Sequence, residues 1–225
     1  MTIQGMIFDF DGTLADTIPL CCAAFREVAQ RQLGRDFTDA QIIDLFGPSE
    51  VGIFQQLAGD RWKDCMHDFL EVYEREHDLC AEAFPGVSDL LAVLSERRIE
   101  VAIVTGKGAG SAAISLKRLG LDRHFDLVES GSPEGSVKPA AIRRIVEHWN
   151  LDPATVAYVG DAPNDVSDAH AAGVVALAAA WAATANREAL AARDPAWLFR
   201  SVDALTEWIQ QNTATPAASG FMSQP

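Results

Sequence analysis

Short apolar runs and longer amphipathic segments alternate along the chain. Five runs rich in β-branched and other apolar residues predict strands, at residues 3–10, 99–105, 125–129, 156–160 and 174–177. Between the later runs, apolar positions recur with a helical period and predict helices at 87–98, 110–119, 139–149 and 164–172. Strands that alternate with helices predict an α/β fold, a Rossmann-like parallel sheet with helices on both faces.

This alternation is interrupted once, directly after the first strand. The segment up to about residue 80 contains no convincing strand and predicts helices at 20–33, 38–46, 51–58 and 62–79. Such a stretch is far too long for an ordinary loop between a strand and a helix. We therefore predict a core formed by residues 1–15 and 85–212, an inserted small helical domain at 16–84, and a disordered tail at 213–225.

Composition and charge narrow the classes of protein. The chain has 225 residues, of which 48% are hydrophobic and 22% charged, and no apolar run is long enough to cross a bilayer. The first residues show no secretory signal, so a cytoplasmic location is expected. The formal net charge of −14 argues against a nucleic acid or an anionic membrane as partner.

The four cysteines give no sign of a metal site or a disulfide framework. Cys21, Cys22, Cys65 and Cys80 form no CxxC pair and no zinc-finger spacing. Three of them lie in segments that predict helices with apolar neighbours, so we expect buried structural thiols.

Two aspartates stand two residues apart where the first strand ends. Asp9 and Asp11 precede Gly12 and Thr13. Side chains at i and i+2 of a strand point the same way, and Gly12 allows a sharp turn, so both carboxylates can face one small volume. Like charges this close repel unless a cation or a shared proton offsets the cost. The alternative is a carboxylate pair that caps the next helix.

Other distinctive polar residues also follow predicted strands or precede helices. Thr105 and Gly106 follow the second strand, Lys138 precedes a helix, and Asp161 and Asp165 follow the fourth strand. Ligands of an open α/β sheet bind beyond the carboxyl ends of its strands, so we expect these residues to converge there. The alternatives are that Thr105 and the two aspartates cap helices and that Lys138 is a solvated loop lysine.

Residues 106–111, GKGAGS, are rich in glycine and invite comparison with nucleotide-binding loops. The segment fails both templates, because GxGxxG would need a glycine at 111 and a Walker loop needs GxxxxGK[ST]. We interpret it as a flexible turn between strand and helix, with amides that help to hold phosphate.

Taken together, these motifs resemble those of the haloacid dehalogenase superfamily of hydrolases. Residues 9–13 match its first motif, Thr105 the second, Lys138 the third, and the GDxxxD run at 160–165 the fourth, in family order and with family spacing. The helical insert resembles the family's C1-type cap. Within the family, the chain is similar to phosphoglycolate phosphatases.

The resemblance implies a role for each motif residue. Asp9 would be the nucleophile that forms an aspartyl-phosphate, and Asp11 the general acid and then the general base. Mg²⁺, which prefers hard oxygen ligands, would be the cofactor. The implied metal ligands are Asp9, the backbone carbonyl of Asp11, Asp161 and Asp165, and the implied phosphate-binding residues are Thr105, Gly106 and Lys138.

The resemblance leaves the substrate open. Many phosphoglycolate phosphatases carry KPxP after the third-motif lysine, whereas residues 138–141 read KPAA, and segment 46–50 of the cap contains no basic residue. The expected activity is that of a Mg²⁺-dependent phosphatase acting on a small phosphorylated metabolite, as a monomer or homodimer. The alternatives are a β-phosphoglucomutase-like phosphosugar mutase and a non-enzymatic protein on the same scaffold. A dehalogenase is disfavoured, because that branch needs neither an acid/base aspartate at position 11 nor Mg²⁺.

Overall fold

The computed structural model describes residues 2–213 and has a single parallel sheet at its centre. The strand order is β3-β2-β1-β4-β5-β6, with every neighbouring pair parallel. The strands are β1 (Gly5–Phe8), β2 (Glu100–Val104), β3 (Leu127–Glu129), β4 (Val156–Gly160), β5 (Val175–Ala179) and β6 (Trp197–Phe199). All residues of β1, β4 and β5 are buried, as expected of strands covered on both faces.

Helices cover both faces of this sheet. They are α5 (Val87–Glu96), α6 (Ala109–Arg118), α7 (Lys138–Trp149), α8 (Pro163–Ala172), α9 (Arg187–Ala191) and α10 (Val202–Asn212). Successive residues of β1 belong to opposite cores: Met6 and Phe8 pack in the cluster that includes Leu91 of α5, and Ile7 in the cluster that includes Ile142 of α7. The predicted Rossmann-like α/β fold is confirmed.

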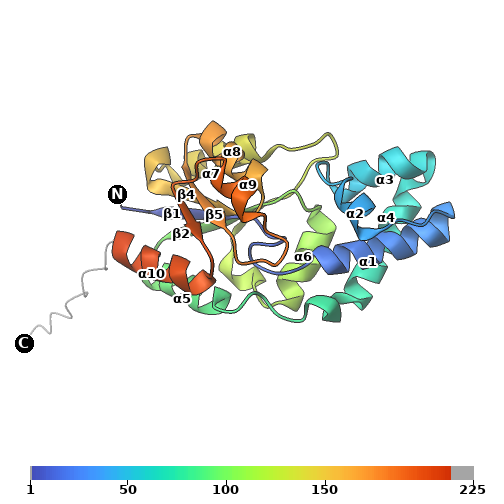
Figure 1. Ribbon diagram of the computed structural model, residues 1–225, viewed down its shortest axis with the longest axis horizontal. Helices are drawn as coiled ribbons and strands as arrows, with labels where there is room; N and C mark the ends of the chain where they lie inside the picture. The colour runs from blue at the N-terminus through green and yellow to red at the C-terminus, as the bar shows by residue number, and fades with distance from the viewer. Residues whose placement is uncertain (1, 214–225) are drawn as a thin grey trace, which may run out of the picture.

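A group of helices is inserted between β1 and α5. It consists of α1 (Ile18–Val28), the π-helix η1 (Ala29–Leu33), α2 (Asp39–Ile43), α3 (Glu50–Ala58), the 3₁₀-helix η2 (Gly59–Arg61), α4 (Trp62–Arg75) and the 3₁₀-helix η3 (His77–Cys80). Three phenylalanines form its centre: the ring of Phe25 lies 4.8 Å from those of both Phe54 and Phe69. We call residues 16–84 the helical insert. Its helices α1 to α4 lie beyond one end of the sheet (Figure 1).

The C-terminal elements were missed by the sequence analysis, which named none after residue 177. The structure adds β6, α9 and α10. β6 is only three residues long and α9 five, too short to show a period. In α10, however, Val202, Leu205, Trp208 and Ile209 are buried at helical spacing after the N-cap Ser201, a signal that was present in the sequence.

Two further predictions concern the C-terminal tail and membrane-spanning helices. The predicted disordered tail at 213–225 lies outside the described residues except for Thr213. Within residues 2–213, no helix has the length and apolar character needed to cross a membrane.

Candidate active site

The predicted site residues lie together at the carboxyl ends of the strands. Asp9 follows β1, Thr105 follows β2 and Asp161 follows β4. β1 pairs with both β2 and β4, so the strand order reverses there, where ligands of open α/β sheets bind. One cavity of about 280 Å³ is lined by all seven predicted residues: Asp9, Asp11, Thr105, Gly106, Lys138, Asp161 and Asp165.

Three aspartates and a lysine form what we call the carboxylate floor of this cavity: Asp9, Lys138, Asp161 and Asp165. One carboxylate oxygen from each aspartate lies within 4.8 Å of the other two. The Lys138 ammonium donates to Asp9 Oδ2 at 2.7 Å and to Asp165 Oδ1 at 2.6 Å. The other oxygen of Asp9 accepts a hydrogen bond from the Phe10 amide at 2.7 Å.

Burial makes this concentration of charge costly. It raises the pKa of Asp161 to about 8, with the charges of Asp9 and Asp165 adding to the effect. It also raises the pKa of Asp9 to about 6, although the Lys138 ammonium acts in the opposite direction. Gly12, at φ +76°, permits this packing, because a Cβ there would collide with the Asp161 carboxylate. A single lysine therefore leaves the three carboxylates with uncompensated negative charge.

The carboxylate floor fits a divalent cation. Its hard oxygen donors are those that Mg²⁺ prefers, and the charge of a bound cation would favour the ionised forms of both Asp9 and Asp161. Asp165 accepts the most hydrogen bonds of the three, because the Ala162 amide at 2.9 Å and the Tyr158 hydroxyl at 3.4 Å donate to it in addition to Lys138. The Asp11 carboxylate does not belong to the group of acidic side chains that could share an ion, which is compatible with the implied role of its backbone carbonyl.

The Asp11 side chain points instead toward the helical insert. Its Oδ1 accepts hydrogen bonds from the Thr17 hydroxyl and from the Lys107 ammonium, the latter at 3.0 Å. The Asp9 side chain is 10% exposed and the Asp11 side chain 20%. The two aspartates of the first motif thus occupy different environments, one beside the other carboxylates and one beside a lysine and a hydroxyl. A nucleophile and an acid/base require such a division.

Lys107 is the site residue that the sequence analysis missed. Its side chain is fully buried, and its ammonium lies 3.3 Å from Cys21 Sγ and 4.6 Å from the centre of the Tyr73 ring. Burial alone would lower the pKa of Lys107, but the surrounding acidic groups, Asp11 first among them, together outweigh burial and hold the pKa well above its usual value. Cys21 and Tyr73 belong to the insert, so no local pattern around the glycines could reveal these contacts.

Glu50 of the insert is also buried next to this loop. Its carboxylate accepts hydrogen bonds from the Gly108 amide and the Ser111 hydroxyl, both at 2.5 Å, and so caps the start of α6. The Gly108 amide is therefore engaged by Glu50, and the loop amides proposed for phosphate reduce to those nearer Thr105. We call Asp11, Cys21, Glu50 and Lys107 the insert-facing wall of the cavity.

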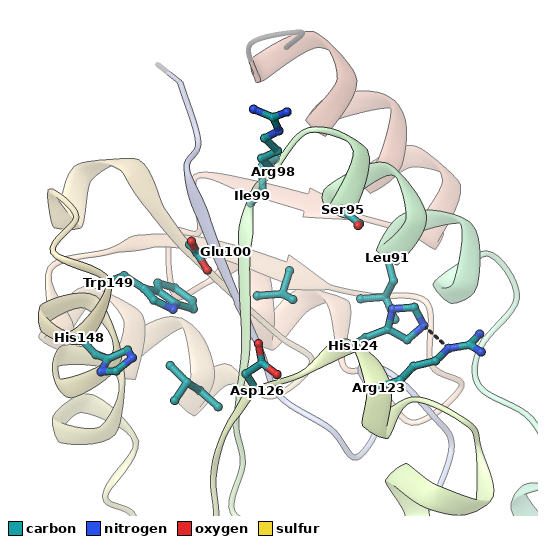
Figure 2. A pocket seen from close by; sticks show the side chains of 12 residues that line it. Leu91, Ser95, Arg98, Ile99, Glu100, Arg123, His124, Asp126, His148 and Trp149 are labelled. Carbon is teal, nitrogen blue, oxygen red and sulfur yellow. Dashed lines mark hydrogen bonds between the residues drawn. The ribbon is translucent and has the colours of Figure 1, made fainter. Parts of the chain in front are cut away.

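A second cavity lies at the other end of the strands, where their amino ends are. Figure 2 shows its side chains, among them Glu100, His124, Asp126 and Trp149, around the amino ends of β2 and β3. It has a volume of about 600 Å³, and none of the predicted site residues lines it. The positions of the sequence motifs and of the switch point of the sheet therefore both indicate that the smaller cavity is the candidate active site.

Known proteins resemble this chain along most of its length. A phosphoglycolate phosphatase from Synechococcus elongatus is 32% identical over 213 residues, which cover 93% of this chain and 98% of the relative. The pyrophosphatase PpaX from Bacillus pumilus is 27% identical over 91% of this chain and 95% of its own. A crystal structure described as a predicted phosphoglycolate phosphatase from Haemophilus somnus shares the fold, with a TM-score of 0.78 at 21% identity over 92% of this chain and 98% of that one.

The family assignment comes from the core and the insert together. The family model for haloacid dehalogenase-like hydrolases matches residues 6–179, which include β1, the helical insert and the strands up to β5. The resemblance seen in the motifs is confirmed, including the likeness to phosphoglycolate phosphatases. The chain belongs to the haloacid dehalogenase-like hydrolase family.

Proposed function

We propose that this hydrolase is a Mg²⁺-dependent phosphatase that cleaves a small phosphomonoester through an aspartyl-phosphate on Asp9. The observation that carries the proposal is the carboxylate floor, in which Lys138 contacts Asp9 at 2.7 Å and two further carboxylates stand ready to share a cation. The similarity to proteins named phosphoglycolate phosphatase and pyrophosphatase supports phosphoryl transfer as the reaction class.

In the first step, a carboxylate oxygen of Asp9 attacks phosphorus. A bond forms between that oxygen and phosphorus as the bond to the leaving oxygen breaks, and Asp11 gives its proton to the leaving alkoxide. Lys138 offsets the negative charge of Asp9 and of the phosphoryl group. Thr105 and Gly106 line the cavity where the phosphoryl oxygens would lie.

In the second step, water replaces the alcohol. Asp11, now ionised, takes a proton from the water molecule that attacks phosphorus, and the bond between phosphorus and Asp9 breaks to release inorganic phosphate. The Lys107 ammonium and the Thr17 hydroxyl hold the Asp11 carboxylate in place. Bound Mg²⁺, held by Asp9, Asp161 and the Asp11 carbonyl with Asp165 beside them, would neutralise charge on the phosphoryl oxygens.

We further propose that the helical insert is a cap domain. It contributes Ile18, Cys21, Phe25 and Glu50 to the lining of the cavity, whereas the carboxylate floor comes from the core. Residues placed in this way can exclude water during phosphoryl transfer and select the leaving group.

The mutase alternative predicts a different fate for the aspartyl-phosphate. A phosphosugar mutase has to hold a second phosphate while the sugar reorients, which requires basic groups on the insert side. No basic residue of the insert lines the cavity in the described part of the chain, so we favour water as acceptor. Interconversion of β-glucose 1-phosphate, primed with the bisphosphate, that ran much faster than phosphate release would reverse this choice.

The proposal is tested by phosphate release with a generic ester such as p-nitrophenyl phosphate. We expect turnover with Mg²⁺, none after exhaustive treatment with EDTA, and recovery when Mg²⁺ is restored. Acid quenching followed by mass spectrometry should find phosphate on the peptide that contains Asp9. Full turnover by the EDTA-treated protein, or phosphate on another residue, would contradict the proposed mechanism.

A further inference from the structure

The side of the cavity formed by the insert is mainly apolar. The insert residues that line it, besides Glu50 and Gly47, are Ile18, Cys21, Phe25, Phe46, Pro48 and Ile53. Cys21, Phe25 and Ile53 are almost fully buried, while Phe46 is 38% exposed. The carboxylate floor lies on the core side, where the phosphoryl group would bind, so these residues face the part of the substrate that leaves.

The insert supplies no cation to this compartment. It carries six arginines and lysines, all within the described residues: Arg26, Arg31, Arg35, Arg61, Lys63 and Arg75. None of them lines the cavity. Arg26 pairs with Asp39, Arg31 with Asp68 and Arg75 with Glu27, all within the insert. An anionic leaving group would therefore find no basic partner on this side.

The two core lysines that line the cavity, Lys107 and Lys138, are already engaged. Lys138 lies between Asp9 and Asp165 on the floor. The Lys107 side chain has no exposed surface, and its ammonium is bonded to Asp11 and Cys21. An anion could recruit Lys107 only by competing with Asp11. Meanwhile Glu50 and Asp168 add negative charge to the lining.

The size of the cavity sets a further limit. Its volume of about 280 Å³ must hold the phosphoryl group and the leaving group together. This is just below the range of roughly 300–1,000 Å³ in which drug-sized ligands bind. The space beside the phosphoryl group therefore suits a compact alcohol.

We infer that the substrate is a phosphomonoester of a small neutral alcohol with an apolar face, and that the site discriminates against a leaving group that carries a carboxylate or a second phosphate. The inference rests on the proposed phosphatase function and names the substrate class for the same site. A buried carboxylate without a partner loses its hydration and gains nothing in return, whereas a neutral group loses much less. The volume of the cavity limits the size of the leaving group, and its apolar and acidic lining selects against negative charge on that group.

The decisive experiment compares two esters that differ only in charge. Phosphoglycolate and phosphoglycolamide have nearly the same size, but the alcohol that leaves carries a carboxylate in the first and a neutral amide in the second. With Mg²⁺ present, we expect kcat/KM for phosphoglycolamide to exceed that for phosphoglycolate by at least about tenfold. Pyrophosphate should be hydrolysed as poorly as phosphoglycolate. Equal or higher kcat/KM for phosphoglycolate would overturn the inference.

A charge introduced on the insert side should reverse the preference. Phe46→Arg places a guanidinium at a partly exposed position of the lining, and we expect it to raise kcat/KM for phosphoglycolate at least about tenfold relative to phosphoglycolamide. Ile43→Arg is the matched control, since Ile43 is 43% exposed and does not line the cavity. Glu50→Gln, which keeps an acceptor for the Gly108 amide, should shift the ratio in the same direction as Phe46→Arg but by less.

The outcomes separate this inference from the function on which it rests. If Phe46→Arg leaves the ratio of the two esters at the wild-type value, the apolar lining does not contact the leaving group and the inference is wrong. If p-nitrophenyl phosphate and the other esters are all left intact with Mg²⁺ present, the proposed phosphatase function fails, and the inference with it. If the generic ester is cleaved and phosphoglycolate is preferred, the function stands and only the inference fails.

Discussion

The carboxylate floor and the insert-facing wall each hold a buried lysine beside an aspartate, but they are assembled differently. On the floor, Lys138 is bonded to Asp9 and Asp165, all from the core and all at the ends of strands or starts of helices. On the wall, Lys107 of the core meets Asp11 from one side and Cys21 of the insert from the other. The floor is thus complete within the core, whereas the wall exists only when the insert lies against it.

This difference divides the chemical tasks. In the proposed mechanism, the floor supplies the nucleophile, and its three carboxylates would hold the cation. In the same proposal, the wall positions Asp11 and lies beside the leaving group. Changes to the floor should therefore abolish turnover with little effect on the insert, while changes to the wall should affect turnover and the contact between core and insert together.

The largest effect is expected at the floor. Asp9→Asn keeps the shape of the side chain but cannot attack phosphorus, so kcat should fall by at least about 10³-fold. Circular dichroism should show an unchanged fold, and steady-state kinetics with p-nitrophenyl phosphate measures the loss. Asp126→Asn, next to β3 at the opposite edge of the sheet, is the control and should retain activity. Near-normal turnover by folded Asp9→Asn would reject Asp9 as the nucleophile.

On the wall, Lys107→Met should combine a catalytic and a structural loss. Once the Lys107 ammonium is removed, Asp11 is held only by Thr17. A misplaced acid/base lowers kcat by about 10²-fold. Removing one partner of a buried ion pair also costs about 3–5 kcal/mol of unfolding free energy. Kinetics and urea denaturation measure the two effects.

The exposed Lys117 of α6 provides the control, because Lys117→Met should change neither quantity. If Lys107→Met were as active and as stable as the wild type, Lys107 would have no part in positioning Asp11, and the contrast between wall and floor would fail.

How well each region can be predicted from the sequence depends on how far apart its contacting residues lie along the chain. The floor could be predicted, because Asp9 and Asp161 follow strands with recognisable apolar runs, while Lys138 and Asp165 lie at the starts of predicted helices. Parallel strands bring their carboxyl ends to one edge of the sheet. The wall could not, because Lys107 and Cys21 are 86 residues apart and the packing of the insert on the core leaves no periodic signal. The same reason hides Glu50, whose acidic side chain in a helical segment gives no sign that it caps a helix of the core.

A smaller effect is expected where the insert caps α6. Glu50→Ala leaves the Gly108 amide buried without an acceptor, while the Ser111 hydroxyl keeps only the Gly108 carbonyl at 3.2 Å, which should cost about 1–3 kcal/mol of unfolding free energy. Glu50→Gln retains an acceptor and should cost less. Chemical denaturation of the two variants beside the wild type measures the difference. Equal stability of Glu50→Ala and the wild type would show that this contact contributes nothing to the docking of the insert.

The smallest effect concerns His77, where η3 meets α6. Its Nε2 lies 2.9 Å from Ser115 Oγ, which also lies 2.8 Å from the Tyr73 hydroxyl. Burial lowers the pKa of His77 below its usual value of 6.5, and the charge of Arg118 adds to the effect. His77 therefore binds a proton more readily in the unfolded chain than in the folded protein. The free energy of unfolding is at its full value above pH 6.5 and decreases as the pH falls toward the lowered pKa of the folded state.

The contribution of His77 can be isolated by comparing unfolding free energies at several pH values. Between pH 6.5 and 5, the wild type should lose up to about 1.4 kcal/mol per pH unit more than His77→Gln, which has no titrating ring. His67→Gln is the control, because His67 is 74% exposed and pairs only with Glu71 on the surface of α4. If His77→Gln and the wild type lost stability in parallel, the imidazole would not be held neutral at this contact. If Ser115→Ala removed the same pH dependence of the unfolding free energy, the effect would lie at the junction of insert and core. The wall of the cavity is built across the same boundary.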